Sequence, residues 1–433
     1  MNKSRKRTPK ALLTEAFNYY TNEKLAECYS ILTDLSEAEL FGINKSLFQK
    51  TVTLLLVGEC FGLHTLNQIL TVSMIKSGTW QKRLASLSYA QIESAVCAIT
   101  KEEGFKAMID LAQKSESSWS RSAISLVIDD CIFKHWLTHG SKDPATTEFF
   151  ARYFSGQSKS VVYGFRITLC GLAIDNTFYP LYFSLTKKTD NTCDIACDLL
   201  EIAHKDILLR CKKAKLVLPN LFLSVDSGFH CKALLDLCST FQDTTLPITL
   251  VCVPKNNHLV AINATPETPE FVGKLPEFID KYFKPIESKF YEDPKNKDEH
   301  FTMRLKINYL SVGKELIILI FRFKRSQKVS VIYTTDLNIK AKTLRHRWFQ
   351  RTQIEQFFRI LKDTLKIQLP KSTNKNEFVR KFCIKMFQAL HVQLFRNFCR
   401  RRFRHLKGFS FQKIRLLLIA HLDSVEILKQ YIM

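Results

Sequence analysis

The sequence has 433 residues, with 64 Lys and Arg against 41 Asp and Glu, which gives a formal net charge of +23 at pH 7. A hydrophobic content of 46% is ordinary for a globular protein and excludes a disordered chain. The length predicts two or three domains, and the excess positive charge indicates a polyanionic partner, most simply nucleic acid. No apolar run reaches the ~18 residues of a membrane span and no apolar segment follows the basic start, so we expect neither a membrane span nor a signal peptide.

The 13 cysteines form no CxxC pair and show no Cys/His spacing typical of zinc sites. Cys193 and Cys197 share one helix face, where packing of small apolar side chains is the simpler interpretation. An odd, scattered set of cysteines is typical of reduced thiols, so we expect a cytoplasmic protein.

Residues 1–118 have the spaced apolar positions of helices. The three clearest stretches are Ala11–Leu32, Leu47–Val57 and Tyr89–Ala112. We therefore predict a helical N-terminal domain over residues 1–118, which contains no convincing helix-turn-helix signature.

The pattern changes to that of strands after residue 118. Apolar runs predict strands over residues 123–128, 160–174, 177–185, 221–225 and 248–253. Asp175-Asn176 is a turn signal that makes a hairpin of the second and third. Helices are expected over Cys193–Lys212 and from Gly228. This β-β-β-α-β-α-β order predicts an α/β layer sheet.

Residues 256–335 interrupt this layer with a mainly β insertion. Strand-like runs follow three prolines and cover Phe301–Tyr309, Glu315–Phe323 and Lys328–Tyr333. We place the α/β domain at residues 119–255 and 336–370. A basic helical C-terminal region at residues 371–433 contains a predicted helix over Glu377–Arg404.

Positive charge is concentrated near the C-terminal third. From Lys340 to Lys407 there are 19 Lys and Arg but only three acids, one of which is Glu355. Asn338 is expected to cap a helix here. At about 100° per residue, one face of it carries Trp348, Arg351, Glu355 and Lys362. A neighbouring apolar stripe is formed by Ile354, Phe357, Phe358, Leu361 and Leu365.

Three carboxylates are candidates for chemistry. Asp129 and Asp226 follow predicted strands, at the sheet edge where α/β proteins bind ligands, and Glu355 lies on the basic helix. Oxygen ligands suit Mg²⁺, and two such ions can clamp the attacking and leaving oxygens of a phosphoryl transfer. Taken singly, each aspartate is more simply explained as a turn or cap residue, and Glu355 as a surface ion pair with Arg351 or Lys362.

Taken together, these residues resemble the DD-E transposases of prokaryotic insertion sequences. One subgroup carries Tyr-x2-Arg-x3-Glu-x6-Lys around its catalytic glutamate, and here the same spacing reads Trp348-x2-Arg351-x3-Glu355-x6-Lys362. The segments Val127-Ile128-Asp129-Asp130 and Ser224-Val225-Asp226-Ser227-Gly228-Phe229 resemble the first and second aspartate motifs of that family. The resemblance covers roughly residues 120–365. It implies that the helical N-terminal domain, residues 1–118, binds the DNA ends of the element.

The resemblance implies an RNase H-like mixed sheet with a mainly β insertion, preceded and followed by helical segments. It implies that Asp129, Asp226 and Glu355 are catalytic and hold two Mg²⁺ ions, for which Mn²⁺ can substitute. The reaction would be cleavage of double-stranded DNA at element ends, followed by transfer of the freed 3′-OH into target DNA. A homodimer on DNA and a cytoplasmic, nucleoid-associated location in a prokaryote are also implied.

DNA contacts are expected from the basic residues around the glutamate and near the end of the chain. The set is Trp348, Arg351, Arg359, Lys362, Arg401 and Arg402. Tryptophan at the family's tyrosine position keeps an aromatic face but lacks the phenolic hydroxyl, which changes a DNA contact rather than the reaction.

Several alternatives stay open at this point. Asp130 competes with Asp129 as the metal ligand, and we favour Asp129 because it directly follows the apolar run. A transposase-derived DNA-binding protein that no longer cuts and an RNase H-like nuclease without strand transfer are rival functions. The terminal repeat, target preference, excision route and oligomeric state off DNA are not given by the sequence.

Overall fold

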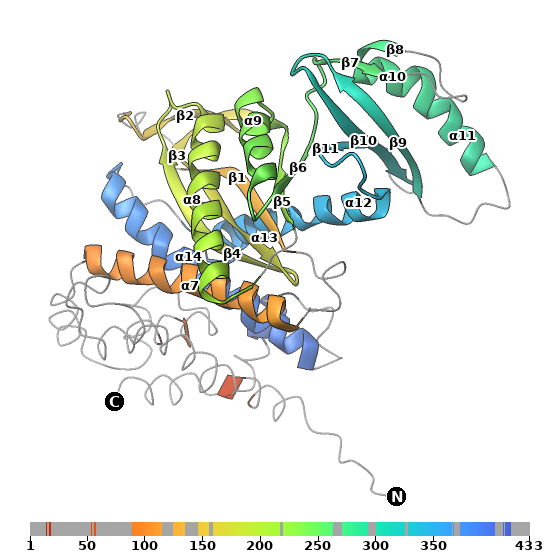
Figure 1. Cartoon of the computed structure of the whole chain (residues 1–433). Coiled ribbons are helices and arrows are strands. Elements are labelled where there is room, and N and C mark those ends of the chain that lie inside the picture. The colour runs from red at the N-terminus through yellow and green to blue at the C-terminus, as the bar shows by residue number, and fades with distance from the viewer. Residues whose placement is uncertain are drawn as a thin grey trace, which may run out of the picture.

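The fold is that of a computed structural model in which two parts share one sheet (Figure 1). The described residues are 14, 17, 18, 53, 56, 57, 89–114, 124–134, 146–155, 159–216, 220–262, 271–292, 300–324, 328–365, 367, 373–402, 410 and 412–416. Most of the predicted N-terminal domain, and the chain beyond residue 416, therefore lie outside the described residues.

The first part, here called the body, is built on a mixed sheet. Its strands are β1 (Ser125–Lys134), β2 (Phe150–Ser155), β3 (Ser160–Ile174), β4 (Thr177–Thr186), β5 (Leu221–Val225) and β6 (Ile248–Cys252). β1 lies between β3, to which it is antiparallel, and β5, to which it is parallel, and β5 is parallel to β6. β4 and β2 pair with the other edge of β3. The predicted mixed α/β sheet is thus confirmed, although the short β2 was not predicted.

The hairpin of β3 and β4 forms where the sequence predicts it. Asp175 and Asn176 connect the strands with φ values of 47° and 65°. Two successive positive φ values give a turn whose twist matches that of the strands, and Asp and Asn tolerate this backbone better than most residues.

β1 is longer than predicted. The strand does not end at Asp129 but continues to Lys134, because its antiparallel pairing with β3 runs along its whole length. Cys131 and Phe133 alternate inward after the acids and supply the buried positions that prolong the strand. Asp129 is therefore a mid-strand residue.

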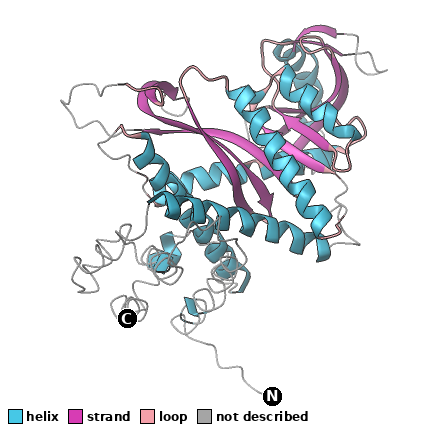
Figure 2. Ribbon diagram, turned by 60° about the vertical axis from the view of Figure 1, so that its left-hand side comes forward, coloured by secondary structure: helices cyan, strands magenta, loops and turns pink. Residues whose placement is uncertain are grey.

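Helices cover both faces of the body sheet (Figure 2). Its helices are α7 (Tyr89–Lys114), α8 (Thr192–Lys213), the 3₁₀ turn Ser227–Phe229, α9 (Lys232–Thr240), the 3₁₀ turn Phe241–Asp243 and α14 (Lys375–Arg402). Tyr182 of β4 donates a hydrogen bond to Asp206 of α8 on one face. On the other face Phe133 of β1 packs against Phe382 of α14. The long α7 packs along β4 and against α14, so this end of the predicted N-terminal region lies on the sheet.

The second part, here called the β lobe, prolongs the same sheet. Its strands are β7 (Leu259–Ile262), β8 (Phe271–Lys274), β9 (His300–Tyr309), β10 (Lys314–Phe323) and β11 (Ser330–Thr334). The sheet order is β2-β3-β1-β5-β6-β11-β10-β9-β7-β8, so that β11 joins the lobe to β6 of the body. The three strands predicted within residues 300–334 are confirmed.

The β lobe also contains helical segments that were not predicted. They are α10 (Leu275–Phe278), a π-helical turn (Ile279–Phe283) and α11 (Lys284–Glu292). Pro276 was interpreted as a mark of irregular chain, but it lies in the first turn of α10, where a missing N–H costs nothing.

Three consecutive segments form the basic helix. They are α12 (Ala341–Gln350), α13 (Thr352–Arg359) and a π-helical turn, η5 (Ile360–Thr364). Asn338 does not cap this helix, because α12 begins after Lys340, and the Asn338 N–H instead donates to Asp336 in a turn. The predicted apolar stripe is buried. None of the described helices is long and apolar enough to cross a membrane, and the 11 cysteines among the described residues are free thiols.

Candidate active site

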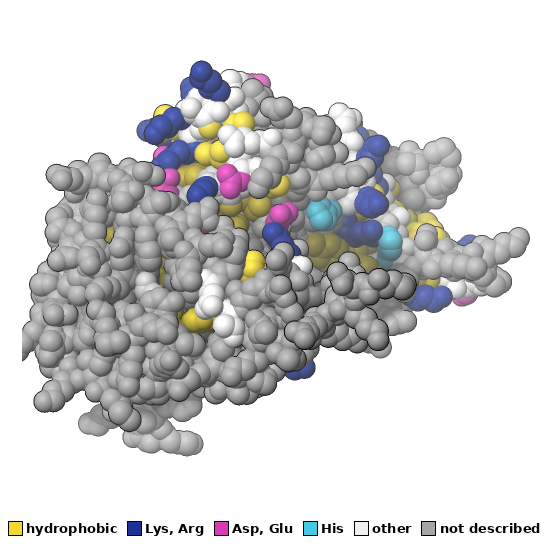
Figure 3. All heavy atoms as spheres, turned by 90° about the horizontal axis from the view of Figure 1, so that it is seen from below, with side chains coloured by type: hydrophobic (Ala, Val, Ile, Leu, Met, Phe, Trp, Pro, Cys, Tyr) yellow, Lys and Arg dark blue, Asp and Glu magenta, His cyan; other side chains and the backbone are white. Residues whose placement is uncertain are grey.

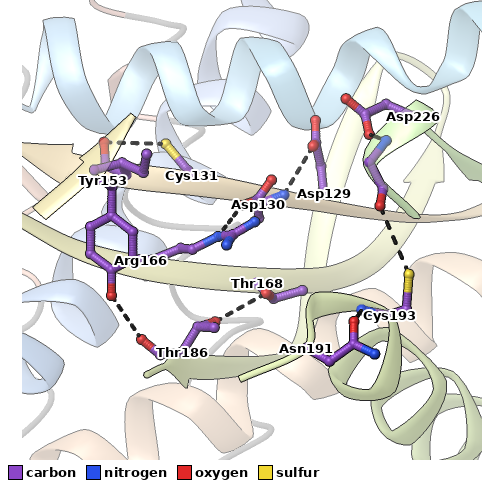
Figure 4. Close-up of polar contacts among 12 residues, drawn as sticks. Asp129, Asp130, Cys131, Tyr153, Arg166, Thr168, Thr186, Asn191, Cys193 and Asp226 are labelled. Atoms are coloured by element: carbon purple, nitrogen blue, oxygen red, sulfur yellow. Dashed lines mark hydrogen bonds and ion pairs between the residues drawn. The ribbon is translucent and has the colours of Figure 1, made fainter. Parts of the chain in front are cut away.

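Asp129 and Asp226 lie side by side on neighbouring strands. β1 and β5 run parallel, and the last pair in their register joins Val127 to Ser224. Asp129 lies two residues further along β1, and Asp226 is the first residue after β5, so the same register places them on one face, about one strand spacing (~4.8 Å) apart. The Asp226 carboxylate is near enough to raise the pKa of Asp129. Figure 4 shows both carboxylates on the same side, toward a helix drawn in pale blue. The Asp226 side chain also accepts a hydrogen bond from the Gly228 N–H, at 2.7 Å.

The Asp129 carboxyl is buried, with 8% of the residue exposed. Its pKa is raised from 3.8 to about 7, mainly by burial; the Arg351 guanidinium opposes this rise, and the nearby Asp226 and Asp130 carboxylates add to it. The cause is the cost of placing a negative charge in a poorly solvated site beside another carboxylate. A nearby cation would stabilise the charged form of a carboxyl with such a raised pKa, and groups of this kind are frequent at functional sites.

Asp130 belongs to the opposite face of the sheet. Its carboxylate accepts a charge-assisted hydrogen bond from Arg166 of β3 (Figure 4). Successive residues of a strand point to opposite faces. The structure therefore groups Asp129, and not Asp130, with Asp226.

Arg351 joins Asp129 to Glu355. One nitrogen of its guanidinium lies 3.0 Å from Asp129 Oδ2, and another donates to Glu355 Oε1. Only 14% of the Arg351 side chain is exposed, against 41% for that of Glu355. The three predicted acids are thus gathered on one face, with a positive charge between the first and the third. The Arg351–Glu355 half of this bridge is the ion pair that the sequence offered as an alternative interpretation. The contact with Asp129 was not indicated, because it joins residues 222 positions apart.

The residues before Arg351 fix its position. Its guanidinium lies over the Trp348 ring, 4.9 Å from the centroid. Arg347 stacks on Phe222 of β5 at 4.4 Å, and the Ser224 hydroxyl donates to the Arg347 carbonyl at 3.2 Å. Burial lowers the pKa of Arg347 to about 10. Trp348 thus supports Arg351 as a half-buried aromatic platform, and its predicted DNA contact stays a prediction.

Lys362 also lies on the Asp129 face. It belongs to η5, and its ammonium is 5.7 Å from the ring centroid of Phe133. Its positive charge opposes the rise in the pKa of the Cys131 thiol that burial causes. Cys131 and Phe133 are the next residues of β1 that point the same way as Asp129. A row of side chains from the acids to Lys362 therefore follows β1. The π-helical turn alters the rotation of the helix just where Lys362 is presented, and such turns are frequent at functional sites.

The other predicted DNA contacts lie elsewhere. Arg359 is exposed at the end of α13. Arg401 of α14 is 3.5 Å from Asp175, in the turn between β3 and β4. Asp129 pairs with Leu169 of β3, six residues from that turn, so Arg401 lies on the order of 20 Å from the acids. Arg402 ends α14, and its side chain lies outside the description. The structure does not bring Arg401 to the acid cluster.

The donor set suits a hard divalent cation but is not closed around one. Asp129, Asp226 and Glu355 offer the carboxylate oxygens that Mg²⁺ prefers. Within the described ranges, however, no three His, Cys, Asp or Glu side chains are grouped closely enough to share a metal ion. The Arg351 guanidinium supplies the positive charge between Asp129 and Glu355 in this arrangement.

Comparisons with known proteins add little to this description. Neither a protein-family model nor a curated protein matches the sequence. Among solved structures, the chain is similar to a piggyBac transposase in a synaptic complex with hairpin DNA, with a TM-score of 0.39 and 9% identity over 97% of this chain and 81% of that one. A similarity of this size does not establish a common fold, so a functional conclusion depends on the site itself.

Proposed function

We propose that this chain is a metal-dependent DNA transposase with an RNase H-like core, which cleaves element ends and transfers the 3′-OH to target DNA. The observation that supports it is the acid cluster: Asp129 and Asp226 are adjacent across a parallel strand pair, and Glu355 is joined to Asp129 through Arg351. A cluster of carboxylates in a chain with a net charge of +23 is what cation-assisted chemistry on a polyanion requires.

Asp129, Asp226 and Glu355 would hold the Mg²⁺ ions. When bound, these ions would lower the pKa of a water nucleophile and stabilise the charge on the attacking and leaving oxygens. Asp129 must be deprotonated to act as a ligand, and because its pKa is raised to about 7, a bound cation would be needed to hold it fully charged near neutral pH.

Arg351 has two roles in this proposal. Without metal it neutralises Asp129 and Glu355. If the acids held divalent ions instead, the guanidinium would be free for a DNA phosphate, which its geometry suits for bidentate binding. Lys362 of η5, which lies beside Phe133 farther along β1, would bind the next phosphate as a point charge. Two element ends need two such sites, so we also infer a dimer on DNA.

The central experiment compares the protein with its Glu355→Gln variant on DNA from either side of its coding region, with Mg²⁺ present. The wild type should cleave at a defined position and, when target DNA is added, should yield joined products. Glu355→Gln should lose cleavage by at least about a thousandfold while binding DNA, because a ligand of the metal is removed but the basic surface is kept.

Asp130→Asn is the matched control for Asp129→Asn. The two positions are adjacent, but Asp130 pairs with Arg166 on the other face. The proposal requires loss of cleavage in Asp129→Asn and retention in Asp130→Asn. Equal loss in both variants, or unchanged cleavage in Glu355→Gln, would show that the reaction centre is elsewhere. Cleavage without joined products would identify a nuclease instead.

A second candidate is a transposase-derived DNA-binding protein that no longer cuts. The position of Arg351 between two acids favours it, since a fixed internal cation would make a divalent ion unnecessary. Absence of Mg²⁺-dependent cleavage in the wild type, combined with tight DNA binding, would identify this function.

A further inference from the structure

A basic pocket lies between β9 of the β lobe and α12. It has a volume of about 400 Å³ and is lined by His300, Thr302, Ala341, Lys342 and Arg345. Figure 3 shows a face of the molecule on which Lys, Arg and His side chains border a hollow with a hydrophobic floor. Acidic side chains lie beside this hollow. We infer that this pocket binds the phosphate backbone of the DNA that enters the proposed active site.

The walls of the pocket are held in place by Arg304. His300, Thr302 and Arg304 alternate along one face of β9. Arg304 donates to the carbonyls of Ile339 at 3.0 Å and Leu337 at 2.6 Å, which fixes the segment before α12 against the strand. The pocket is therefore a feature of two joined elements and not a gap between loose ones.

The cations of the pocket are available to an anion. Lys342 and Arg345 are three residues apart on α12 and so lie on the same side of that helix. Within the part of the chain that the structure describes, neither forms an ion pair with an acid. The first turn of α12 has no acidic residue and no side-chain cap, which leaves the positive end of the helix dipole uncompensated there. The Thr302 hydroxyl is buried and has no hydrogen-bond partner among the described residues.

The direction of α12 relates the pocket to the acids. Ten residues separate Arg345 from Glu355, which corresponds to about 15 Å along a nearly continuous helix. Phosphates of one DNA strand follow one another every ~3.4 Å along the duplex axis, so the pocket would receive a phosphate about four positions from the reacting one. A polyanion that runs along α12 can contact the pocket and reach the acid cluster at the same time. For this reason we assign DNA and not a small anion or an acidic peptide.

The assignment rests on the proposed function only in taking DNA as the partner, so the test uses equilibrium binding with EDTA, in which no cleavage occurs. The affinity of a duplex is measured between ~50 and ~200 mM salt for the wild type, for Lys342→Ala/Arg345→Ala and for Lys205→Ala/Lys212→Ala. The last pair is an exposed control on α8, which covers the other face of the sheet. It makes the same change in net charge.

The pocket variant should bind DNA about tenfold more weakly, and its plot of log affinity against log salt should be shallower by about 2, since each lost phosphate contact removes ~0.9. The control pair should change the slope by much less. Lys342→Glu alone, at an exposed position, changes the net charge by the same two units as the double variant and should weaken binding to a similar extent. An unchanged slope in the pocket variant, or an equal change in the control, overturns the inference even if the protein cleaves DNA.

Discussion

At the scale of single residues, Asp129 has the most telling environment. It is buried on a strand between two other carboxylates, and Arg351 is its cation partner. Its raised pKa means that the folded protein holds a proton that the unfolded chain releases. Ionisation of Asp129 in the folded protein lowers the free energy of unfolding, and binding of a cation at this site would restore that free energy.

Asp129→Asn should therefore stabilise the protein at high pH. With a pKa near 3.8 unfolded and about 7 folded, the wild type keeps the full contribution of the protonated carboxyl below about pH 4 and loses it as the pH rises through 7. Asp129→Asn has no carboxyl to ionise and so keeps its stability as the pH rises. Urea unfolding should give the variant a free energy of unfolding up to about 4 kcal/mol above that of the wild type at about pH 8, and a nearly equal value at about pH 4. Asp130→Asn, which breaks a paired acid, should show no such gain, and a gain that is the same at both pH values would contradict the assignment.

Arg351→Gln should make the protein more responsive to Mg²⁺. The substitution removes the cation that opposes the rise in the Asp129 pKa, so the acids gain more from a divalent ion. Thermal unfolding with and without saturating Mg²⁺ should give a larger rise in Tm for the variant than for the wild type. Arg166→Gln, which frees Asp130 on the other face, is the control and should respond as the wild type does. Equal shifts in all three proteins would argue against a metal site.

At the scale of elements, the sequence predicts those helices and strands whose bounds are set by turn residues and by the spacing of apolar side chains. The hairpin, β5 and α8 are predicted nearly to the residue because turn chemistry and apolar periodicity define them. β2 and the helices after Pro276 are missed, since a strand of only six residues shows little periodicity and a proline in a first helical turn resembles a loop. Asp226 and Glu355 could be selected from their positions, whereas the pairing of Asp129 with Asp226 depends on the β1–β5 register, which no local pattern encodes.

The β3–β4 turn offers a test of the local kind. Asn176 has a φ of 65°, in the left-handed region that disfavours a Cβ-branched or alanine side chain. Asn176→Ala should lower the free energy of unfolding by about 1 kcal/mol, and Asn176→Gly should leave it unchanged or raise it. Urea unfolding of both variants distinguishes backbone conformation from the loss of an asparagine side chain, because only the latter would affect the two variants equally.

At the scale of the whole molecule, one sheet joins the body to the β lobe. β11 pairs with β6 through only Tyr333 with Cys252 and Thr334 with Val251. A seam cluster of apolar side chains under α12 reinforces this junction. Its buried members are Phe222, Val251, Ile317, Leu319, Phe321, Ile332, Ile339 and Leu344. Because α12 also carries the proposed pocket and leads to Arg351, the junction sets the position of the DNA-binding residues relative to the acids.

Leu344→Ala should therefore loosen the two parts from each other. Leu344 is fully buried and packs against residues of both parts. Its truncation should cost about 2–5 kcal/mol, from lost burial and the cavity left behind. Hydrogen exchange should show the amides of β10 and β11 opening together with those of β5 and β6 in the wild type, and independently of them in the variant. Leu310→Ala, at a position 48% exposed, is the control and should change neither measurement. If the β lobe already opens independently in the wild type, the shared sheet does not couple the two parts, and the DNA path along α12 would need another means of alignment.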